Sequence, residues 1–241
     1  MKPTLNHLRQ PIGELLENWS PALIPQNSIL NGQFCRVEPL NVDSHMSELY
    51  EAFTKDSKNK IWTYLPYGPF EGSALFSEWM QNYCLRNDPM FFAIIDNVSS
   101  KAVGMASYLR IQSEVGLIEV GHINYSSSLQ RTIAGTEAMF LMMQNAFSKL
   151  GYRRYEWKCD SLNRRSRRAA ERLGFTYEGT FRQATIYKKR NRDTSWYSII
   201  DKEWRALEQA YLEWLSFGNF DSKGKQKVKL SFFIDIYRDK I

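Results

Sequence analysis

The sequence contains little cysteine and shows no regular spacing of metal-binding residues. Its three cysteines are an odd and scattered set, which excludes a disulfide framework. The cysteines are Cys35, Cys84 and Cys159, and the histidines are His7, His45 and His122. These positions share no spacing typical of zinc sites, so we expect reduced thiols and no bound metal.

Long apolar stretches are also lacking. No run of about 18 apolar residues occurs, and residues 1–13 lack the apolar centre of a signal peptide. We therefore expect a cytoplasmic protein with no membrane contact. The 43% of hydrophobic and 24% of charged residues are typical of a globular protein and exclude disorder over most of the chain.

The net charge of +6 favours anionic partners without saying which. Basic residues crowd two regions, Arg153–Arg168 and Lys188–Arg192. Most of these side chains are expected to form solvated faces.

Proline and hydrophobic periodicity divide the chain into three parts. Residues 1–27 hold four prolines around one short helical candidate, Ile12–Trp19, and predict an arm lying on the domain. Residues 28–217 predict one domain. In the extension, residues 218–241, apolar residues alternate from Val228 to Ile236, which predicts an extra strand or a partner contact.

The first half of the domain predicts a mixture of strands and helices. Asn31-Gly32 lies between two apolar runs and favours a hairpin with a two-residue turn. Helical spacing follows over residues 42–53, with Asn41 or Asp43 as the cap, and again over residues 72–86. Residues 90–95, 102–111 and 117–125 then predict a three-strand antiparallel meander.

Between these helices lies an aromatic segment broken by proline and glycine. Its aromatic side chains are Trp62, Tyr64, Tyr67 and Phe70. An aromatic loop without a period either packs onto the core or lines a pocket for an organic ligand, and the sequence leaves both interpretations open.

The stretch Leu117–Leu150 predicts a strand, a small polar loop and a helix. The helix is indicated by apolar residues at helical spacing from Met139 onward. Such a turn presents free backbone N–H groups and the positive end of the helix dipole, which together form an anion site. A strand over residues 155–159 follows, and the strand–helix–strand order predicts a parallel pair with a right-handed crossover.

A second informative helix is predicted from Asp160 to Phe175. Asn163 and Ser166 lie three residues apart at its start, where one helix edge presents both. Helix capping explains Asn163 at least as well as ligand contact does. Strands over 175–184 and 194–200 and a helix from Asp201 complete the domain.

In this order of elements the chain resembles the GNAT superfamily of acetyl-CoA-dependent N-acetyltransferases, and within it the ribosomal-protein N-terminal acetyltransferases (RimJ/RimL-like). Residues 130–138, Asn163 with Ser166, and residues 172–175 carry the resemblance. It implies an α/β (α+β) fold, with a mixed, mostly antiparallel sheet, helices on both faces and a splayed strand pair around the cofactor. The pyrophosphate loop departs from the family pattern, because Ala134 and Thr136 replace its glycines and Gly135 is displaced by one position.

The resemblance also implies residue roles. Backbone groups near Ile123 and Tyr125 would bond the pantetheine, and Asn163 and Ser166 would contact it. Arg131 or Arg168 would reach the 3′-phosphate. The pyrophosphate would be received by Gln130, Arg131, Thr132, Ile133, Ala134, Gly135 and Thr136.

Acetyl transfer to an amine requires a base for the ammonium proton. Glu119 is the first candidate because the resembling branch often has an acidic residue there; the alternative is a cross-strand ion pair. His122, more often a partly buried histidine than a catalyst, lies three residues further, so an ideal strand places the two on opposite faces unless a bulge intervenes. The tyrosine acid of many family members is replaced by Ala170, which leaves Ser166 or a water it holds.

Two other functions fit parts of the sequence. One is a GNAT fold that binds acyl-CoA as a sensor, suggested by the altered loop and the missing tyrosine. The other is an RNA-binding protein, although the aromatic loop lies far from the arginine helix and no RNA-binding signature is present. The acceptor, a protein N-terminus or a small amine, and the choice between monomer and homodimer stay open.

Overall fold

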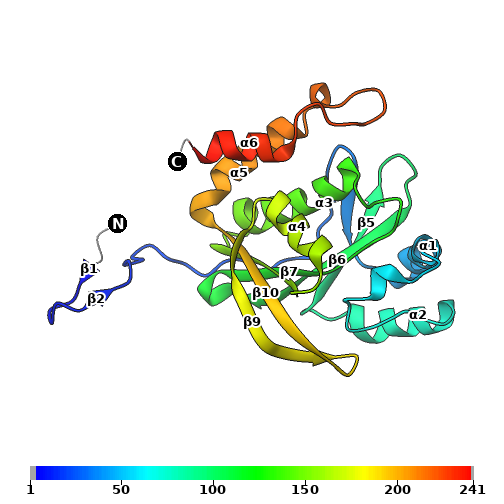
Figure 1. The fold of residues 1–241 in the computed structure, drawn as a ribbon, viewed down its shortest axis with the longest axis horizontal. Coiled ribbons are helices and arrows are strands. Elements are labelled where there is room, and N and C mark those ends of the chain that lie inside the picture. The colour runs from blue at the N-terminus through cyan, green and yellow to red at the C-terminus, as the bar shows by residue number, and fades with distance from the viewer. Residues whose placement is uncertain (1–3, 240–241) are drawn as a thin grey trace.

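The chain forms one large sheet flanked by helices (Figure 1). The structure, a computed structural model, describes residues 4–239. The eight-stranded sheet has the order β3-β4-β5-β6-β7-β8-β10-β9, and only β7 and β8 are parallel. Its strands are β3 (Leu30–Asn31), β4 (Cys35–Pro39), β5 (Met90–Asp96), β6 (Ala102–Gln112), β7 (Leu117–Tyr125), β8 (Arg154–Asp160), β9 (Thr176–Tyr187) and β10 (Arg190–Ile200).

Helices cover both faces of the sheet and enclose two hydrophobic cores. One core packs α3, α4, α5 and α6 against residues such as Tyr108, Trp157 and Tyr197. The other packs α1 and α2 against Phe91 and Met105, and we name this side the α1/α2 face. The helices are α1 (Val42–Thr54), α2 (Ser73–Trp79), α3 (Ile133–Gln144), α4 (Arg164–Arg172), α5 (Asp201–Trp214) and α6 (Leu230–Arg238), with π-helical turns after α2 (Met80–Cys84) and α3 (Asn145–Lys149).

The predicted fold class is confirmed. Strands β5, β6 and β7 form the antiparallel meander, and β7 and β8 form the parallel pair. The Asn41 side chain caps α1 by accepting a hydrogen bond from the N–H of Ser44 at 2.9 Å. Helices on both faces match the expectation from the resemblance.

Glu137 of α3 fastens the first hairpin to the rest of the domain. Its carboxylate accepts hydrogen bonds from the backbone N–H groups of Gln33, Phe34 and Cys35 at 2.7–2.8 Å, and Glu137 is 2% exposed. A side chain at Gly32 would collide with this carboxylate, since a Cβ there would lie 2.5 Å from the Glu137 carboxyl carbon. The predicted hairpin is present, but the predicted two-residue turn at Asn31-Gly32 is wrong: Asn31 pairs with Arg36, and residues 32–35 form a four-residue loop around the buried carboxylate.

Two predictions of secondary-structure elements are also wrong. Residues 230–238 form helix α6 and not a strand, because Leu230, Phe233 and Ile234 have helical spacing and bury one face. Residues 13–19 form no helix; their side chains are mostly exposed, so a helix there would bury no apolar face.

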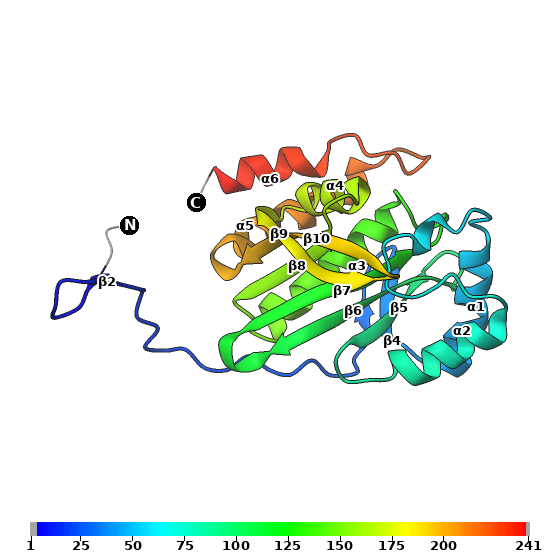
Figure 2. The same ribbon diagram turned by 60° about the horizontal axis from the view of Figure 1, so that its bottom comes forward.

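The first strands, β1 (Thr4–Leu5) and β2 (Pro11–Ile12), pair only with each other. Figures 1 and 2 show this hairpin lying apart from the rest of the chain, so it does not lie on the domain as expected. The segment after this hairpin contacts the body through an ion pair of Glu14 with Lys202 of α5 at 2.6 Å. It also contacts the body at Trp19, whose indole N–H donates a hydrogen bond to the carbonyl of Glu114 at 3.0 Å. Among residues 4–239, no helix is long and apolar enough to cross a membrane.

Candidate active site

A bulge in β7 brings Glu119 and His122 to the same face of the sheet. Gly121 pairs with Ser107, but Asn124 pairs with Met105, so β7 carries one extra residue, and His122 has φ +51°. The neighbours of Glu119 in β7, Ile118 and Val120, point into the core that α3 covers. Glu119 therefore points to the opposite side of the sheet, the α1/α2 face. His122 also contacts that side, because its ring centroid lies 5.1 Å from that of Phe91.

Strands β7 and β8 separate just beyond Glu119. Their pairing ends at Val120 and Trp157, although β7 continues to Tyr125 and β8 to Asp160. We name this opening the β7–β8 gap. Backbone groups that face the gap have no strand partner, so an extended, hydrogen-bonding chain fits between them.

The N-terminus of α3 lies at the end of β7 and presents free donors. The Thr132 hydroxyl accepts a hydrogen bond from the Gly135 N–H at 3.0 Å. Within residues 4–239, the N–H groups of Ile133 and Ala134 have no acceptor. The left-handed residue of the loop is Arg131, with φ +63°, so the loop turns without the usual glycines. These features match an anion site at a helix N-terminus.

Gly135 has a steric role in this loop. A Cβ at this position would lie 2.7 Å from the Leu129 carbonyl oxygen and 3.1 Å from the Tyr125 ring. The Tyr125 hydroxyl donates a hydrogen bond to the Gly135 carbonyl at 2.9 Å, and the Gln130 amide donates to the Tyr125 carbonyl at 2.8 Å. The end of β7 and the start of α3 are therefore held together closely.

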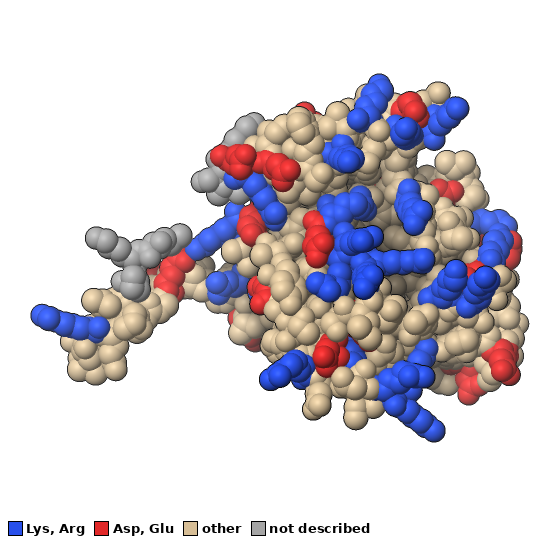
Figure 3. Space-filling model, viewed as in Figure 1, with Lys and Arg blue, Asp and Glu red and all other residues tan. Residues whose placement is uncertain are grey.

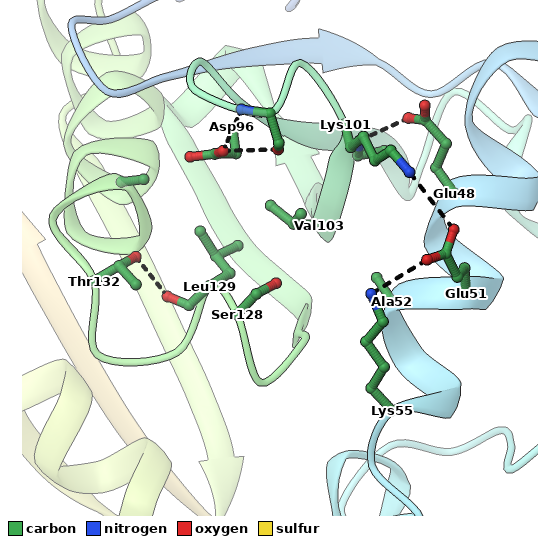
Figure 4. Close-up of a pocket in the computed structure, with 13 residues that line it drawn as sticks. Glu48, Glu51, Ala52, Lys55, Asp96, Lys101, Val103, Ser128, Leu129 and Thr132 are labelled. Carbon is green, nitrogen blue, oxygen red and sulfur yellow. Dashed lines mark hydrogen bonds and ion pairs between the residues drawn. The ribbon is translucent and has the colours of Figure 1, made fainter.

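A cavity of about 310 Å³ lies on the other side of this loop (Figure 4). Ser128, Leu129 and Thr132 form one wall, and α1 forms the opposite wall. Its charged residues are already paired, as in the contacts of Glu51 with Lys55 and Lys101. Glu119, Asn163 and Ser166 do not line it, so we separate this cavity from the site at the β7–β8 gap.

Asn163 and Ser166 lie at the start of α4, where both are engaged with the protein. The Asn163 side chain caps α4 by accepting a hydrogen bond from the Ser166 N–H at 3.1 Å. The Ser166 hydroxyl accepts one from the Trp157 indole N–H at 2.9 Å. The capping role considered for Asn163 is confirmed. Ala170, at the position of the family's tyrosine, is fully buried.

Several arginine side chains around α4 are free to meet an anion. Arg167 is not, because its guanidinium donates to the Tyr197 hydroxyl at 3.1 Å, and Arg172 donates to the Thr136 hydroxyl at 3.0 Å. In α4 and in the loop before α3, four exposed arginines have guanidinium groups with no hydrogen bond or ion pair to any residue from 4 to 239. They are Arg131, Arg164, Arg165 and Arg168. Figure 3 shows Lys and Arg side chains gathered on the face where α4 lies.

Glu119 is buried and ion-paired. It is 6% exposed, and its Oε2 lies 2.9 Å from Lys158 Nζ and 3.5 Å from Arg110 Nε. Desolvation raises the pKa of Glu119, and the two cations oppose that rise. The predicted cross-strand ion pair is present, which leaves a catalytic role open. Lys158 was missed by the sequence analysis, although its alternation with Trp157 and Cys159 indicates that it points to the other face.

His122 is a neutral histidine packed among aromatic rings. Its Nδ1 lies 3.0 Å from the Tyr67 hydroxyl, and burial lowers the pKa of His122 to about 4. A base of such low pKa is nearly always unprotonated at pH 7 but is weak. The contacts of His122 with Tyr67, Tyr83 and Phe91 therefore suit a structural role.

The aromatic loop packs onto the core and also contacts the turn between β9 and β10 and the segment before α4. Trp62 is 4% exposed and lies with Phe70 in the α1/α2 core. The Trp62 carbonyl accepts a hydrogen bond from Lys188 at 2.8 Å, and the Tyr64 hydroxyl donates one to the Leu162 carbonyl at 3.2 Å. Packing, one of the two interpretations, is thus confirmed for Trp62, and Tyr67 and Phe70 pack against the same core. Substrate contact stays a prediction and is best suited to Tyr64.

We searched the described residues for side chains that could bind a metal ion. Residues 4–239 contain no group of three or more His, Cys, Asp or Glu side chains arranged to hold a metal ion. The three cysteines are free and buried.

Comparison with known proteins supplies the family context. The model of the acetyltransferase (GNAT) domain matches residues 36–176. No curated protein sequence matches the chain. A GCN5-related N-acetyltransferase from Brucella melitensis is 46% identical, with a TM-score of 0.89, over 91% of this chain and 100% of its own.

Two further structures are similar. A probable GNAT-family acetyltransferase from Chromobacterium violaceum is 40% identical, with a TM-score of 0.76, over 82% of this chain and 98% of its own. The microcin C7 self-immunity acetyltransferase MccE, solved with acetyl-CoA and AMP, is 20% identical, with a TM-score of 0.62, over 70% of this chain and 93% of its own. The MccE likeness concerns the fold alone.

Proposed function

Since the chain belongs to the acetyltransferase (GNAT) family, we propose that it is an N-acetyltransferase that moves the acetyl group of acetyl-CoA to a primary amine in a ternary complex. One observation carries this proposal: the β7–β8 gap opens between Glu119 and the free N–H groups at the start of α3. The acceptor class we propose is a protein N-terminus or a small amine, in line with the resemblance of residues 130–138 and 172–175 to the RimJ/RimL-like branch.

The chain's own groups fit coenzyme A. The N–H groups of Ile133 and Ala134 suit the pyrophosphate, and the free arginines around α4 suit the 3′-phosphate. Backbone groups of Ile123 and Tyr125 line the gap in which an extended pantetheine arm fits. A structure of the similarly folded MccE holds acetyl-CoA, which supports the same co-substrate here.

In the proposed reaction the amine nitrogen attacks the thioester carbonyl, and the C–S bond breaks. Glu119 accepts the proton of the incoming ammonium, directly or through water, because an ammonium has no lone pair for attack. A backbone N–H of residues 123–125 polarises the carbonyl. Ser166, or a water held by it, donates a proton to the departing thiolate, since Ala170 cannot. It regains a proton from the amine nitrogen, which loses its second proton as the amide forms.

Acetyl-CoA turnover against a panel of peptides, polyamines and amino sugars tests this function. We expect at least one primary amine to be acetylated, and acetyl-CoA to raise the melting temperature. Glu119→Gln should lower kcat by about a hundredfold while coenzyme A affinity survives. Unchanged turnover in Glu119→Gln would remove Glu119 from the mechanism.

A catalytically weak acyl-CoA sensor is the second candidate. It is favoured by two observations: Ala170 stands at the tyrosine position, and the Glu119 carboxylate is already paired with Lys158. Coenzyme A binding without turnover across the whole panel would support it. RNA binding fits less well, because Trp62 is buried in the core and Phe70 packs against it, so neither ring is free to stack on bases.

A further inference from the structure

A row of alternating charges crosses the α1/α2 face beside the β7–β8 gap. Arg110 of β6 contacts Glu119 of β7 at 3.5 Å, Glu119 contacts Lys158 of β8 at 2.9 Å, and Lys158 contacts Glu156 at 2.7 Å. Arg154 continues the row by contacting Glu156 at 2.7 Å. Lys158 is therefore a cation that two buried carboxylates share.

Lys158 is held rigidly in this position. Its side chain is 7% exposed, and its Nζ lies 3.7 Å from the centroid of the Trp196 ring. A buried ammonium over an indole ring gains a cation–π contact in addition to its two ion pairs. Phe181 stacks on Trp196, with 4.4 Å between the ring centroids. The ammonium thus has little freedom to leave Glu119.

The two oxygens of Glu119 have different surroundings. Lys158 and Arg110 each make their closest contact with Oε2. Oε1 lies toward Gly121, where a Cβ would be 3.7 Å away from it. Gly121 is the first residue of β7 beyond its pairing with β8. One oxygen is fixed by cations, and the other lies toward the gap.

The register between β7 and β8 places two carboxylates side by side, and Lys158 compensates their charge. Glu119 and Glu156 are directly paired residues of the parallel ladder, and both are buried. Two like charges in such a setting disfavour one another, and one of them takes up a proton unless a cation compensates. Lys158, the next residue of β8 on the same face as Glu156, supplies that cation to both.

We propose that Lys158 is a positioning residue that fixes Oε2 of Glu119 and keeps this carboxylate ionised, so that Oε1 accepts the proton of the acceptor amine. The inference rests on the proposed function, in which Glu119 is the base. The charged groups facing Glu119 are Lys158 and Glu156 from β8 and Arg110 from β6. Lys158 and Arg110 lower the pKa of Glu119, and Glu156 raises it, against a larger rise caused by burial.

The direct test is a carboxylate titration by NMR on protein labelled with ¹³C at the glutamate side chain. Glu119→Gln identifies the Glu119 signal. Lys158→Met should raise the pKa of Glu119, whereas Glu156→Gln should lower it, because the first removes an attractive charge and the second a repulsive one. Lys158→Arg should stay close to wild type. These opposite directions would not arise from a purely structural role.

The same variants give a kinetic readout. In Lys158→Met the acidic limb of kcat/KM should move to higher pH, and at a fixed pH on that limb kcat/KM should fall tenfold for each pH unit by which the limb moves. Ionisation of the acceptor amine also produces an acidic limb in kcat/KM. Measuring two acceptors whose amines differ in pKa distinguishes the two, because the limb caused by the amine shifts between acceptors and the limb caused by Glu119 does not. If Lys158→Met does not fold, Glu156→Gln still tests the direction of the shift, and Lys158→Arg remains its control.

The outcomes separate the two proposals. An unshifted Glu119 titration in both Lys158→Met and Glu156→Gln would overturn the role of Lys158, even with full turnover in the wild type. A wild type that binds coenzyme A but acetylates no amine would overturn the proposed function instead, and the NMR titration would still report whether Lys158 controls Glu119.

Discussion

Tyr67 and His122 share a hydrogen bond of 3.0 Å between the tyrosine hydroxyl and Nδ1, and their rings stack with centroids 5.6 Å apart. The pair joins the aromatic loop to the bulge of β7. Because the surrounding rings exclude water, the pKa of His122 falls to about 4. The loop is therefore attached to the candidate active site through a neutral imidazole.

This relationship predicts an acid-dependent loss of stability. Between pH 6.5 and 4 the unfolded chain binds a proton at His122 that the folded chain does not, so the free energy of unfolding falls as pH falls. The loss attributable to His122 should be on the order of 3 kcal/mol at pH 4. Urea unfolding of wild type and His122→Asn across this range measures it, since asparagine tolerates the left-handed backbone at this position.

The variant should lose this part of the pH dependence, whereas carboxylates that titrate in the same range affect both proteins equally. His7→Asn is the matched control because His7 is exposed. Identical slopes for wild type and His122→Asn would show that His122 does not titrate abnormally.

The sequence predicted the parts of the fold that depend on local periodicity. The meander of β5 to β7 follows from alternating apolar residues, and the cap at Asn41 follows from a short polar side chain before a helix. Helix α6 was mistaken for a strand because its apolar residues satisfy both periods over a short segment; burial of Phe233 decides for the helix.

The candidate site could be predicted only in part, for a different reason. Glu119 and Ser166 follow from resemblance to the family, but Lys158 meets Glu119 through the register between β7 and β8, which is a tertiary property. The bulge at His122 arises likewise from pairing with β6. No single-strand pattern specifies which residue of one strand will face which residue of the next.

Gly135→Ala should damage the coenzyme A site. Its added methyl group would lie 2.7 Å from the Leu129 carbonyl oxygen, so the loop or the start of α3 must move. We expect a destabilisation of about 1–3 kcal/mol and at least a tenfold loss of coenzyme A affinity. Isothermal titration calorimetry and thermal unfolding measure the two effects.

Gly13→Ala provides the control, because nothing lies within 4 Å of a Cβ at Gly13. Full coenzyme A affinity in Gly135→Ala would mean that the N-terminus of α3 does not receive the pyrophosphate.

Arg168→Gln should weaken binding of coenzyme A but not of dephospho-coenzyme A. Arg168 is an exposed residue of α4 and has no hydrogen bond or ion pair within the described residues, so its guanidinium is available to the 3′-phosphate. A charge-assisted contact of this kind corresponds to roughly a tenfold change in affinity. Arg205→Gln, an exposed residue of α5, is the control. Equal losses of affinity for coenzyme A and dephospho-coenzyme A would show that Arg168 does not contact the 3′-phosphate.

Ser166→Ala should lower kcat more than it changes the KM for acetyl-CoA. The Ser166 hydroxyl accepts a hydrogen bond from the Trp157 indole at 2.9 Å, and in the proposed reaction it serves the departing thiolate. Trp157→Phe is the matched variant, because it removes the same hydrogen bond and leaves the hydroxyl in place. We expect a loss of about a hundredfold in kcat for Ser166→Ala and a small loss for Trp157→Phe. Equal losses in steady-state assays of the two variants would show that the hydrogen bond between α4 and β8 matters, and that the hydroxyl proton does not.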